Sequence, residues 1–199
     1  FQLSSGMEQA FLIKAIAEWK KSKSFLEIGT GRGTACYAAS LVKSIENIDT
    51  IDLLPFDMKR SEAIGYKSAN VSNSDLYRMI PFNEKRKIAF HERSMVRDNI
   101  LNKSKKFDLF FIDGNHTDFN TIFEDFQICR LTSSKRPIFI WDDYYPDKFA
   151  VKDVIHRIMK VSDEYDFLLV ESRGHIFPGK SKELGCGTVL MSKSGELNI

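Results

Sequence analysis

Residues 25–33 read FLEIGTGRG, and this stretch decides the fold. It begins with a short apolar run, which predicts a buried strand. Gly29, Gly31 and Gly33 follow at every second position, and such spacing predicts a backbone that turns sharply and approaches a ligand closely. Glu27 places a carboxylate directly ahead of these glycines. The ligand should therefore carry a hydrogen-bond donor or a positive charge.

The rest of the chain alternates apolar runs with helical patterns. The patterns predict helices at residues 7–20, 34–44, 94–101, 119–131 and 148–161. They predict strands at residues 25–28, 48–53, 88–91, 107–112, 137–141, 167–171 and 187–192. Apolar strands that alternate with helices predict an α/β fold in three layers, with a mostly parallel sheet between helices. No helix is predicted between the last two strands, so we expect them to form an antiparallel hairpin at one edge.

Length and composition favour one ordinary globular domain. The chain has 199 residues, which is enough for a substantial core, and 43% of them are apolar. We expect a single domain over 1–199, with an N-terminal helix in 1–22 and the core in 23–199. The net charge of +2 is too small to indicate a nucleic-acid partner. The chain is too short to include a large added lid over a ligand pocket. A second copy of the chain in a homo-oligomer is therefore a candidate to complete the pocket.

Neither a membrane partner nor an oxidising compartment is indicated. No apolar run is long enough to span a bilayer, and no charged segment followed by an apolar core opens the sequence. Cys36, Cys129 and Cys186 are odd in number and widely separated, which does not suggest disulfides or a zinc site. We therefore expect a cytoplasmic protein.

The glycine spacing and Glu27 together indicate the kind of nucleoside. A dinucleotide fingerprint is G-x-G-x-x-G, and the spacing here is one residue shorter. Asp52 follows Gly33 by 19 residues and ends the second predicted strand, where an acid can bind ribose hydroxyls. A pyrophosphate would be repelled by Glu27, whereas an ammonium or a sulfonium would be attracted. A cationic amino-acid nucleoside fits better than NAD.

Two later strands also end in carboxylates. FFIDGNH places Asp113 at the end of one strand, and FIWDDYY places Asp142 and Asp143 at the end of the next. Adjacent parallel strands bring such ends side by side, where three carboxylates would repel one another and raise each other's pKa. A hard divalent cation such as Mg²⁺ removes that repulsion because it takes oxygen ligands. We therefore predict a metal site formed by these three residues.

FLEIGTGRGTA resembles motif I of the class I S-adenosylmethionine-dependent methyltransferases, and TIDL resembles the following ribose-binding motif. The resemblance implies a Rossmann-like fold and S-adenosylmethionine as cofactor. In the branch of the family that acts on small-molecule hydroxyls, a G-D-S-like turn after the third strand contacts the adenine base. In the corresponding HERS turn at 91–94, only Ser94 matches, and Arg93 stands where that branch has an acid. The cofactor contacts that the resemblance implies come from Glu27, Gly29, Thr30, Gly31, Gly33, Asp52, Ser94 and Asp113.

The acidic strand ends resemble those of the metal-dependent O-methyltransferases, namely the catechol-type enzymes and the antibiotic-sugar branch. That resemblance implies that Asp113, Asp142 and Asp143 hold the ion and that a small-molecule hydroxyl is methylated. His116 stands where the catechol-type enzymes have a lysine, and a neutral imidazole there is a candidate general base. Six aromatic residues in loops near the predicted edge are candidates to line a substrate pocket or to pack the loops, namely Phe56, Tyr66, Tyr77, Phe82, Tyr144 and Tyr145. Tyr144 and Tyr145 are favoured because they directly follow the acidic pair.

Three other functions stay open at this point. One is a module that binds the cofactor but transfers no methyl group, and another is an NAD-dependent oxidoreductase on a similar sheet. The third is methylation of protein or nucleic acid, which the lack of a basic face and of an N-P-P-Y-like tetrapeptide disfavours. The substrate itself is not encoded in any motif.

Overall fold

The computed structural model describes residues 8–31, 33–59, 72–144, 149–170, 187–195 and 197. Its strands are β1 (Ser24–Ile28), β2 (Asn47–Asp52), β3 (Ile88–Glu92), β4 (Phe107–Ile112), β5 (Ser133–Trp141), β6 (Tyr165–Val170) and β7 (Thr188–Lys193). They form one seven-stranded sheet in the order β3-β2-β1-β4-β5-β7-β6. The first five strands are parallel, and β7 runs antiparallel to both β5 and β6. The predicted sheet and its final hairpin are confirmed.

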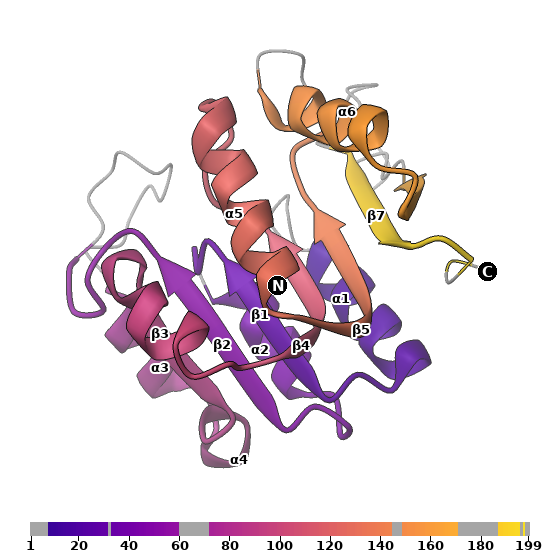
Figure 1. The fold of residues 1–199 in the computed structure, drawn as a ribbon. Helices are drawn as coiled ribbons and strands as arrows, with labels where there is room; N and C mark the ends of the chain where they lie inside the picture. The colour runs from indigo at the N-terminus through magenta and orange to yellow at the C-terminus, as the bar shows by residue number, and fades with distance from the viewer. Residues whose placement is uncertain are drawn as a thin grey trace, which may run out of the picture.

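Helices cover both faces of this sheet (Figure 1). They are α1 (Glu8–Lys20), α2 (Thr34–Ser40), α3 (Asn73–Met79), α4 (Phe82–Lys85), α5 (Phe119–Leu131) and α6 (Val151–Val161). Residues of α1 and α2 pack with the side chains of one face, and residues of α5 and α6 pack with those of the other. The predicted three layers are therefore present.

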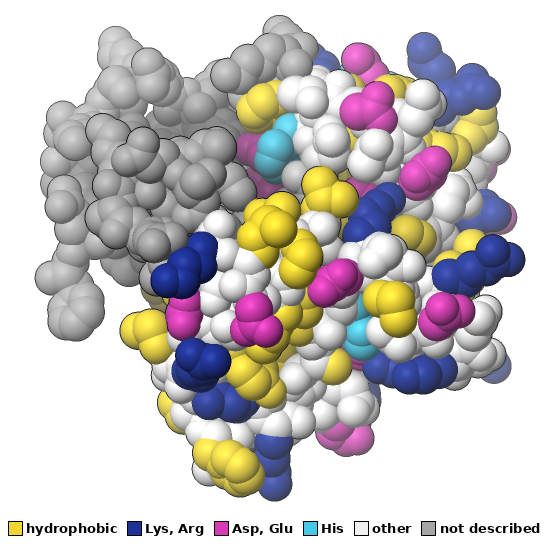
Figure 2. All heavy atoms as spheres, turned by 90° about the vertical axis from the view of Figure 1, so that its left-hand side faces the viewer, with side chains coloured by type: hydrophobic (Ala, Val, Ile, Leu, Met, Phe, Trp, Pro, Cys, Tyr) yellow, Lys and Arg dark blue, Asp and Glu magenta, His cyan; other side chains and the backbone are white. Residues whose placement is uncertain are grey.

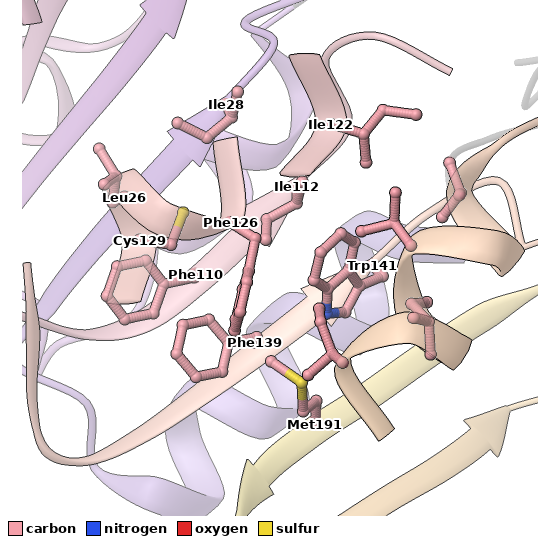
Figure 3. Packing of buried hydrophobic residues seen from close by; sticks show 14 of the residues in the cluster. Leu26, Ile28, Phe110, Ile112, Ile122, Phe126, Cys129, Phe139, Trp141 and Met191 are labelled. Carbon is pink, nitrogen blue, oxygen red and sulfur yellow. The ribbon is translucent and has the colours of Figure 1, made fainter. Parts of the chain in front are cut away.

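The core on the α5 side is rich in aromatic rings (Figure 3). Phe126 of α5 contacts Phe139 and Trp141 of β5, with ring centroids 5.7 Å apart in both pairs. Phe110 of β4 stacks on Phe139 at 4.8 Å. Aromatic pairs at such separations stabilise a core beyond the burial of their area, so this cluster fixes α5 on the two central strands.

The register of the parallel strands aligns their carboxyl ends. Ile28 of β1 lies opposite Ile51 of β2 and Ile112 of β4, and Ile112 lies opposite Trp141 of β5. The residues that follow these positions therefore stand in one row at the edge of the sheet. That row is Gly29, Asp52, Asp113 and Asp142. Ligands of open α/β sheets bind at this edge, so the fold brings most of the predicted site residues to the expected place.

The turn after β1 requires glycine for two independent reasons. Gly29 has a φ of +93°, which side chains with a Cβ rarely adopt. A Cβ there would also lie 2.1 Å from the carbonyl oxygen of Asp113. Backbone hydrogen bonds hold this close approach, because Gly29 donates to Ile51 at 2.8 Å and Asp113 donates to Ile28 at 2.9 Å.

Some predicted elements differ in type or length. Residues 94–101 were expected to be one helix, but they form a 3₁₀ turn (Arg93–Met95) and a π-helical turn (Arg97–Leu101). The second helix ends at Ser40 rather than at residue 44, and β5 begins at Ser133 rather than at Pro137. Met7, Lys148, Glu171 and Cys186, which belong to other predictions, lie outside the described residues.

In the described parts of the chain, no helix has both the length and the apolar character needed to cross a membrane. Figure 2 shows the side of the molecule that carries β3 and α3. On the described part of this side, basic and acidic side chains are interspersed, with apolar side chains between them. This side therefore presents no broad surface of one charge.

Candidate active site

Two adjoining cavities open at the carboxyl edge of the sheet. We call the larger one the nucleoside cavity, with a volume of about 570 Å³. We call the smaller one the acidic cavity, with a volume of about 210 Å³. Both are lined by Gly29, Gly31 and Asp113. An elongated ligand that passes the glycine turn would therefore occupy both cavities.

Glu27 lines the acidic cavity and is only 1% exposed. The hydroxyl of Thr50 donates to its Oε2 at 2.5 Å, and the hydroxyl of Thr30 lies 2.7 Å from that of Thr50. Burial raises the pKa of Glu27 to about 8, and the Thr50 hydrogen bond only partly offsets this. Without a bound cation, Glu27 is therefore mostly protonated at neutral pH, and a bound cation would favour its ionised form.

Asp52 lines the nucleoside cavity, where the sequence predicts contact with a ribose. Its Oδ1 accepts from the backbone N–H of Leu54 at 3.0 Å, and its Oδ2 lies 3.5 Å from the amide nitrogen of Asn73. These contacts hold the carboxylate at the end of β2 in a defined orientation. Such an acid can accept hydrogen bonds from both hydroxyls of a ribose.

The predicted base-binding turn is arranged differently from expectation. Ser94 is exposed on the 3₁₀ turn, whereas its neighbour Arg93 lines the nucleoside cavity. The guanidinium of Arg93 pairs with Asp125, which α5 buries beneath the same cavity. Burial raises the pKa of Asp125, and the charge of Arg93 opposes that rise.

Asp125 was missed by the sequence reasoning, although a signal for it exists. On α5, Ile122, Phe126 and Cys129 form the inward apolar stripe, and Asp125 stands within that stripe. An acid on the buried face of a helix needs a partner, because an unpaired buried charge is costly. Here the partner is the arginine that replaces the acid of the family.

Asp113, His116 and Asp143 form a cluster between the ends of β4 and β5. Each offers one donor atom, and these atoms lie within 4.8 Å of one another. Nδ1 of His116 lies 2.8 Å from Oδ2 of Asp143, and this hydrogen bond raises the pKa of His116. Two carboxylates and an imidazole fit a hard or borderline divalent cation. The donor set is thus chemically suited to the predicted ion.

Asp142, the third predicted metal ligand, is not part of this cluster. It lines the acidic cavity, and the side-chain amide of Gln9 donates to both of its carboxylate oxygens at 3.0 Å. Gln9 comes from α1 and was also missed by the sequence reasoning. The strand pattern offers a signal for this arrangement, because alternate residues of a strand share a face. Asp142 therefore continues the face of Ile140, which packs against α1.

A third cavity is mostly apolar and has a volume of about 390 Å³. Phe56 and Tyr77 line it, together with Phe90 of β3. The rings of Phe56 and Phe90 lie 4.8 Å apart, and those of Phe56 and Tyr77 lie 5.6 Å apart. Two of the six predicted aromatic residues thus pack together beside α3, whereas Tyr66 and Tyr145 lie outside the described residues. Contact of any of the six with a substrate stays a prediction.

Comparisons with known proteins find relatives through structure alone. No protein-family model matches the chain, and no curated protein sequence matches it. Solved structures do match, among them the O-methyltransferase TomG from Streptomyces achromogenes, involved in tomaymycin synthesis and solved with S-adenosylmethionine. That match has a TM-score of 0.66 at 17% identity and covers 97% of this chain and 82% of TomG.

Two further matches agree with this one. An O-methyltransferase from Bacillus cereus, solved with S-adenosylhomocysteine, has a TM-score of 0.64 at 14% identity, covering 96% of this chain and 82% of that one. The methyltransferase domain of a bacterial CtHen1 has a TM-score of 0.59 at 15% identity, covering 94% of this chain and 98% of that one. This chain therefore has the fold of the class I S-adenosylmethionine-dependent methyltransferases.

Proposed function

We propose that this chain is an S-adenosylmethionine-dependent methyltransferase that methylates a hydroxyl group of a small molecule with the help of a divalent cation. One observation carries the proposal. The two cavities meet at the glycine turn, with Asp52 in one and Glu27 in the other. An elongated nucleoside with a ribose at one end and an ammonium at the other has the matching chemistry, and structures of the same fold were solved with S-adenosylmethionine and S-adenosylhomocysteine.

Each cavity would bind one part of the nucleoside. Asp52 would accept hydrogen bonds from the ribose hydroxyls, and Gly29, Gly31 and Gly33, with Thr30, would let the backbone approach the ligand closely. Glu27 would attract the ammonium group. Ser94 was predicted to contact the base and stays a prediction, although Arg93 is the neighbour that lines the cavity.

Asp113 and Asp143 would hold the cation, with His116 beside them. Asp142, predicted as a ligand, is hydrogen-bonded to Gln9 instead, so we do not assign the ion to it. When bound, a divalent cation would lower the pKa of the substrate hydroxyl and orient its oxygen.

His116 would act as the general base. If Nδ1 donates its proton to Asp143, then Nε2 is the basic nitrogen of the neutral ring. The substrate oxygen attacks the sulfonium methyl carbon, so a C–O bond forms and the C–S bond breaks. His116 takes the hydroxyl proton, and the thioether nucleoside leaves. Asp143 fixes the orientation of the imidazole. This contributes to the rate because it holds the base within hydrogen-bond reach of the hydroxyl.

The test combines binding with turnover. The wild-type protein should bind S-adenosylhomocysteine in calorimetry and transfer a labelled methyl group to members of a hydroxyl-compound panel. His116→Ala should lower kcat by about 100-fold or more while changing the Kd for the nucleoside by less than about 3-fold. His156→Ala is the matched control, because this histidine of α6 is exposed and forms a hydrogen bond with Tyr144.

Each failure has a separate meaning. Normal turnover in His116→Ala would remove the base assignment alone. Binding without transfer across the panel would favour a cofactor-binding module. Preference for NAD over the sulfonium nucleoside in equilibrium dialysis would favour an oxidoreductase.

A further inference from the structure

Among the described residues that line the acidic cavity, every charged side chain is acidic. They are Glu27, Asp113, Asp142 and Asp143. So many carboxylates around about 210 Å³ repel one another unless a cation or protons reduce their charge. The cluster with His116 accounts for Asp113 and Asp143. Glu27 and Asp142 remain, and Asp142 is hydrogen-bonded to Gln9 of α1.

Gln9 supplies an independent sign that a ligand belongs there. Its side chain lines the cavity and is only 6% exposed. Its amide nitrogen donates to both oxygens of Asp142, while its Oε1 is buried and has no hydrogen-bond partner among the described residues. A buried acceptor without a donor carries the cost of its lost hydration. A ligand that donates a hydrogen bond would remove this cost.

Backbone geometry separates Asp142 from Asp143. Asp142 follows the alternation of β5 and faces α1, as Ile140 does. Asp143 has a φ of +56°, which turns the chain, and its carboxylate reaches His116. Two adjacent acids therefore belong to two different groups of side chains.

We infer that Gln9 and Asp142, together with Glu27, bind the primary ammonium group of the nucleoside's amino-acid end. This inference rests on the proposed function and gives Gln9 and Asp142 a role that is separate from the cation. A primary ammonium has three N–H donors. The carboxylates of Glu27 and Asp142 attract its positive charge and accept two of these hydrogen bonds, and Gln9 Oε1 accepts the third. Gln9 is thus a specificity-determining residue, because a ligand without the amino group leaves its Oε1 unpaired.

The experiment compares two ligands that differ in one group. Calorimetry measures the Kd of S-adenosylhomocysteine and of its analogue in which hydrogen replaces the α-amino group. Wild-type protein should prefer the amino compound by about 10- to 150-fold, the range of hydrogen bonds to charged groups. Gln9→Leu and Asp142→Asn should each reduce this preference by about 10-fold. Both should bind the deaminated analogue with a Kd within about 3-fold of wild type, which also shows that they fold.

Asp143→Asn is the matched control, read out by Mn²⁺ binding in electron paramagnetic resonance without nucleoside. It should lose Mn²⁺ affinity and keep the preference for the amino compound, whereas Asp142→Asn and Gln9→Leu should keep Mn²⁺ affinity. Loss of Mn²⁺ binding in Asp142→Asn with an unchanged ligand preference would overturn the inference. Equal binding of both ligands by wild type would overturn it too. If wild type bound neither ligand, the proposed function itself would fail.

Discussion

Among single side chains, Glu27 determines how the site responds to pH. Its pKa rises from an ordinary value of 4.5 to about 8 because the carboxyl is buried. A group whose pKa is raised by folding favours the folded state below its unfolded pKa, and this contribution is lost as pH rises through the folded pKa. The loss therefore spans pH 4.5 to about 8 and amounts to roughly 5 kcal/mol at most.

Glu27→Gln should stabilise the protein at high pH. The amide cannot ionise, so the gain in the free energy of unfolding should be small at pH 5 and several-fold larger at pH 9. Thermal or urea unfolding at pH 5, 7 and 9 measures this, with wild type as reference. A gain that is equal at all three pH values would contradict the assigned titration. The same variant should lose affinity for S-adenosylhomocysteine.

Nucleoside binding should release a proton near neutral pH. With a pKa of about 8, Glu27 is mostly protonated at pH 7 in the free protein, and an adjacent ammonium would favour its carboxylate. Calorimetry in buffers of different ionisation enthalpy should therefore report release of close to one proton at pH 7. Glu27→Gln should abolish that release, and proton uptake by wild type would contradict the prediction.

The sequence predicted that Glu27, Asp52, Asp113 and His116 lie at the carboxyl edge of the sheet, because strand ends and glycine spacing mark these positions. In the structure they line the two cavities at that edge. It was insufficient for Gln9. A glutamine near the start of a helix carries no signal of its own, and only the packing of α1 against β5 brings it to Asp142.

Among the elements, the turn between β1 and α2 is the most constrained. Gly29→Ala should prevent stable folding or cost more than about 3 kcal/mol, because the new Cβ would meet backbone atoms at 2.1 Å and φ is +93°. Gly195→Ala is a matched control, since Gly195 has a φ of +85° but no atom within 4 Å of the added Cβ. It should cost only about 1–2 kcal/mol. Urea unfolding compares the two, and equal costs would show that close approach is not the constraint.

Helix prediction succeeded where a cap and an apolar stripe agree. The bounds of α5 were predicted as Phe119 to Leu131, and Asp118 caps it by accepting from the N–H of Thr121. The stretch after β3 misled the prediction, because Val96 and Ile100 give a helical spacing of four. Those two residues are buried, but the backbone around them forms 3₁₀ and π-helical turns rather than one α-helix. Periodicity reports which side chains are buried, and it does not fix the hydrogen-bond pattern.

In the molecule as a whole, a hydrogen-bonded cluster around the buried Asp49 connects β2 with β3 and with the segment before β4. Oδ1 of Asp49 on β2 lies 2.5 Å from His91 of β3 and 2.5 Å from Lys105, just before β4. Burial alone would raise the pKa of Asp49, but hydrogen bonds from His91 and Lys105 outweigh burial and lower it. This cluster therefore stabilises the fold above the ordinary pKa near 3.8, and that contribution is lost as pH falls below it.

Asp49→Asn should destabilise the protein by roughly 2–4 kcal/mol at pH 7, because it removes the buried carboxylate charge that pairs with Lys105 and accepts a hydrogen bond from His91. The deficit relative to wild type should shrink below about pH 4, where wild type loses the same charge. Urea unfolding across pH 3 to 7 checks this. A deficit that stays constant over that range would assign the effect to shape rather than to charge.

The mostly parallel sheet and its final antiparallel hairpin followed from simple patterns, namely apolar runs alternating with helices and a final pair without a helix. The separate contacts of Asp142 with Gln9 and of Asp143 with His116 were not predicted, because the prediction treated the two acids as one pair. The two-residue period of β5 and the left-handed backbone at Asp143 direct them apart.

That divergence has an evolutionary consequence if both proposals hold. A single peptide bond joins the acid assigned to the amino group and the acid assigned to the ion, yet substitutions of the two side chains act separately. A lineage could lose its dependence on metal through changes at position 143 and retain the nucleoside through position 142. Descendants with different metal requirements could then arise from one ancestor without changes in the residues that bind the methyl donor.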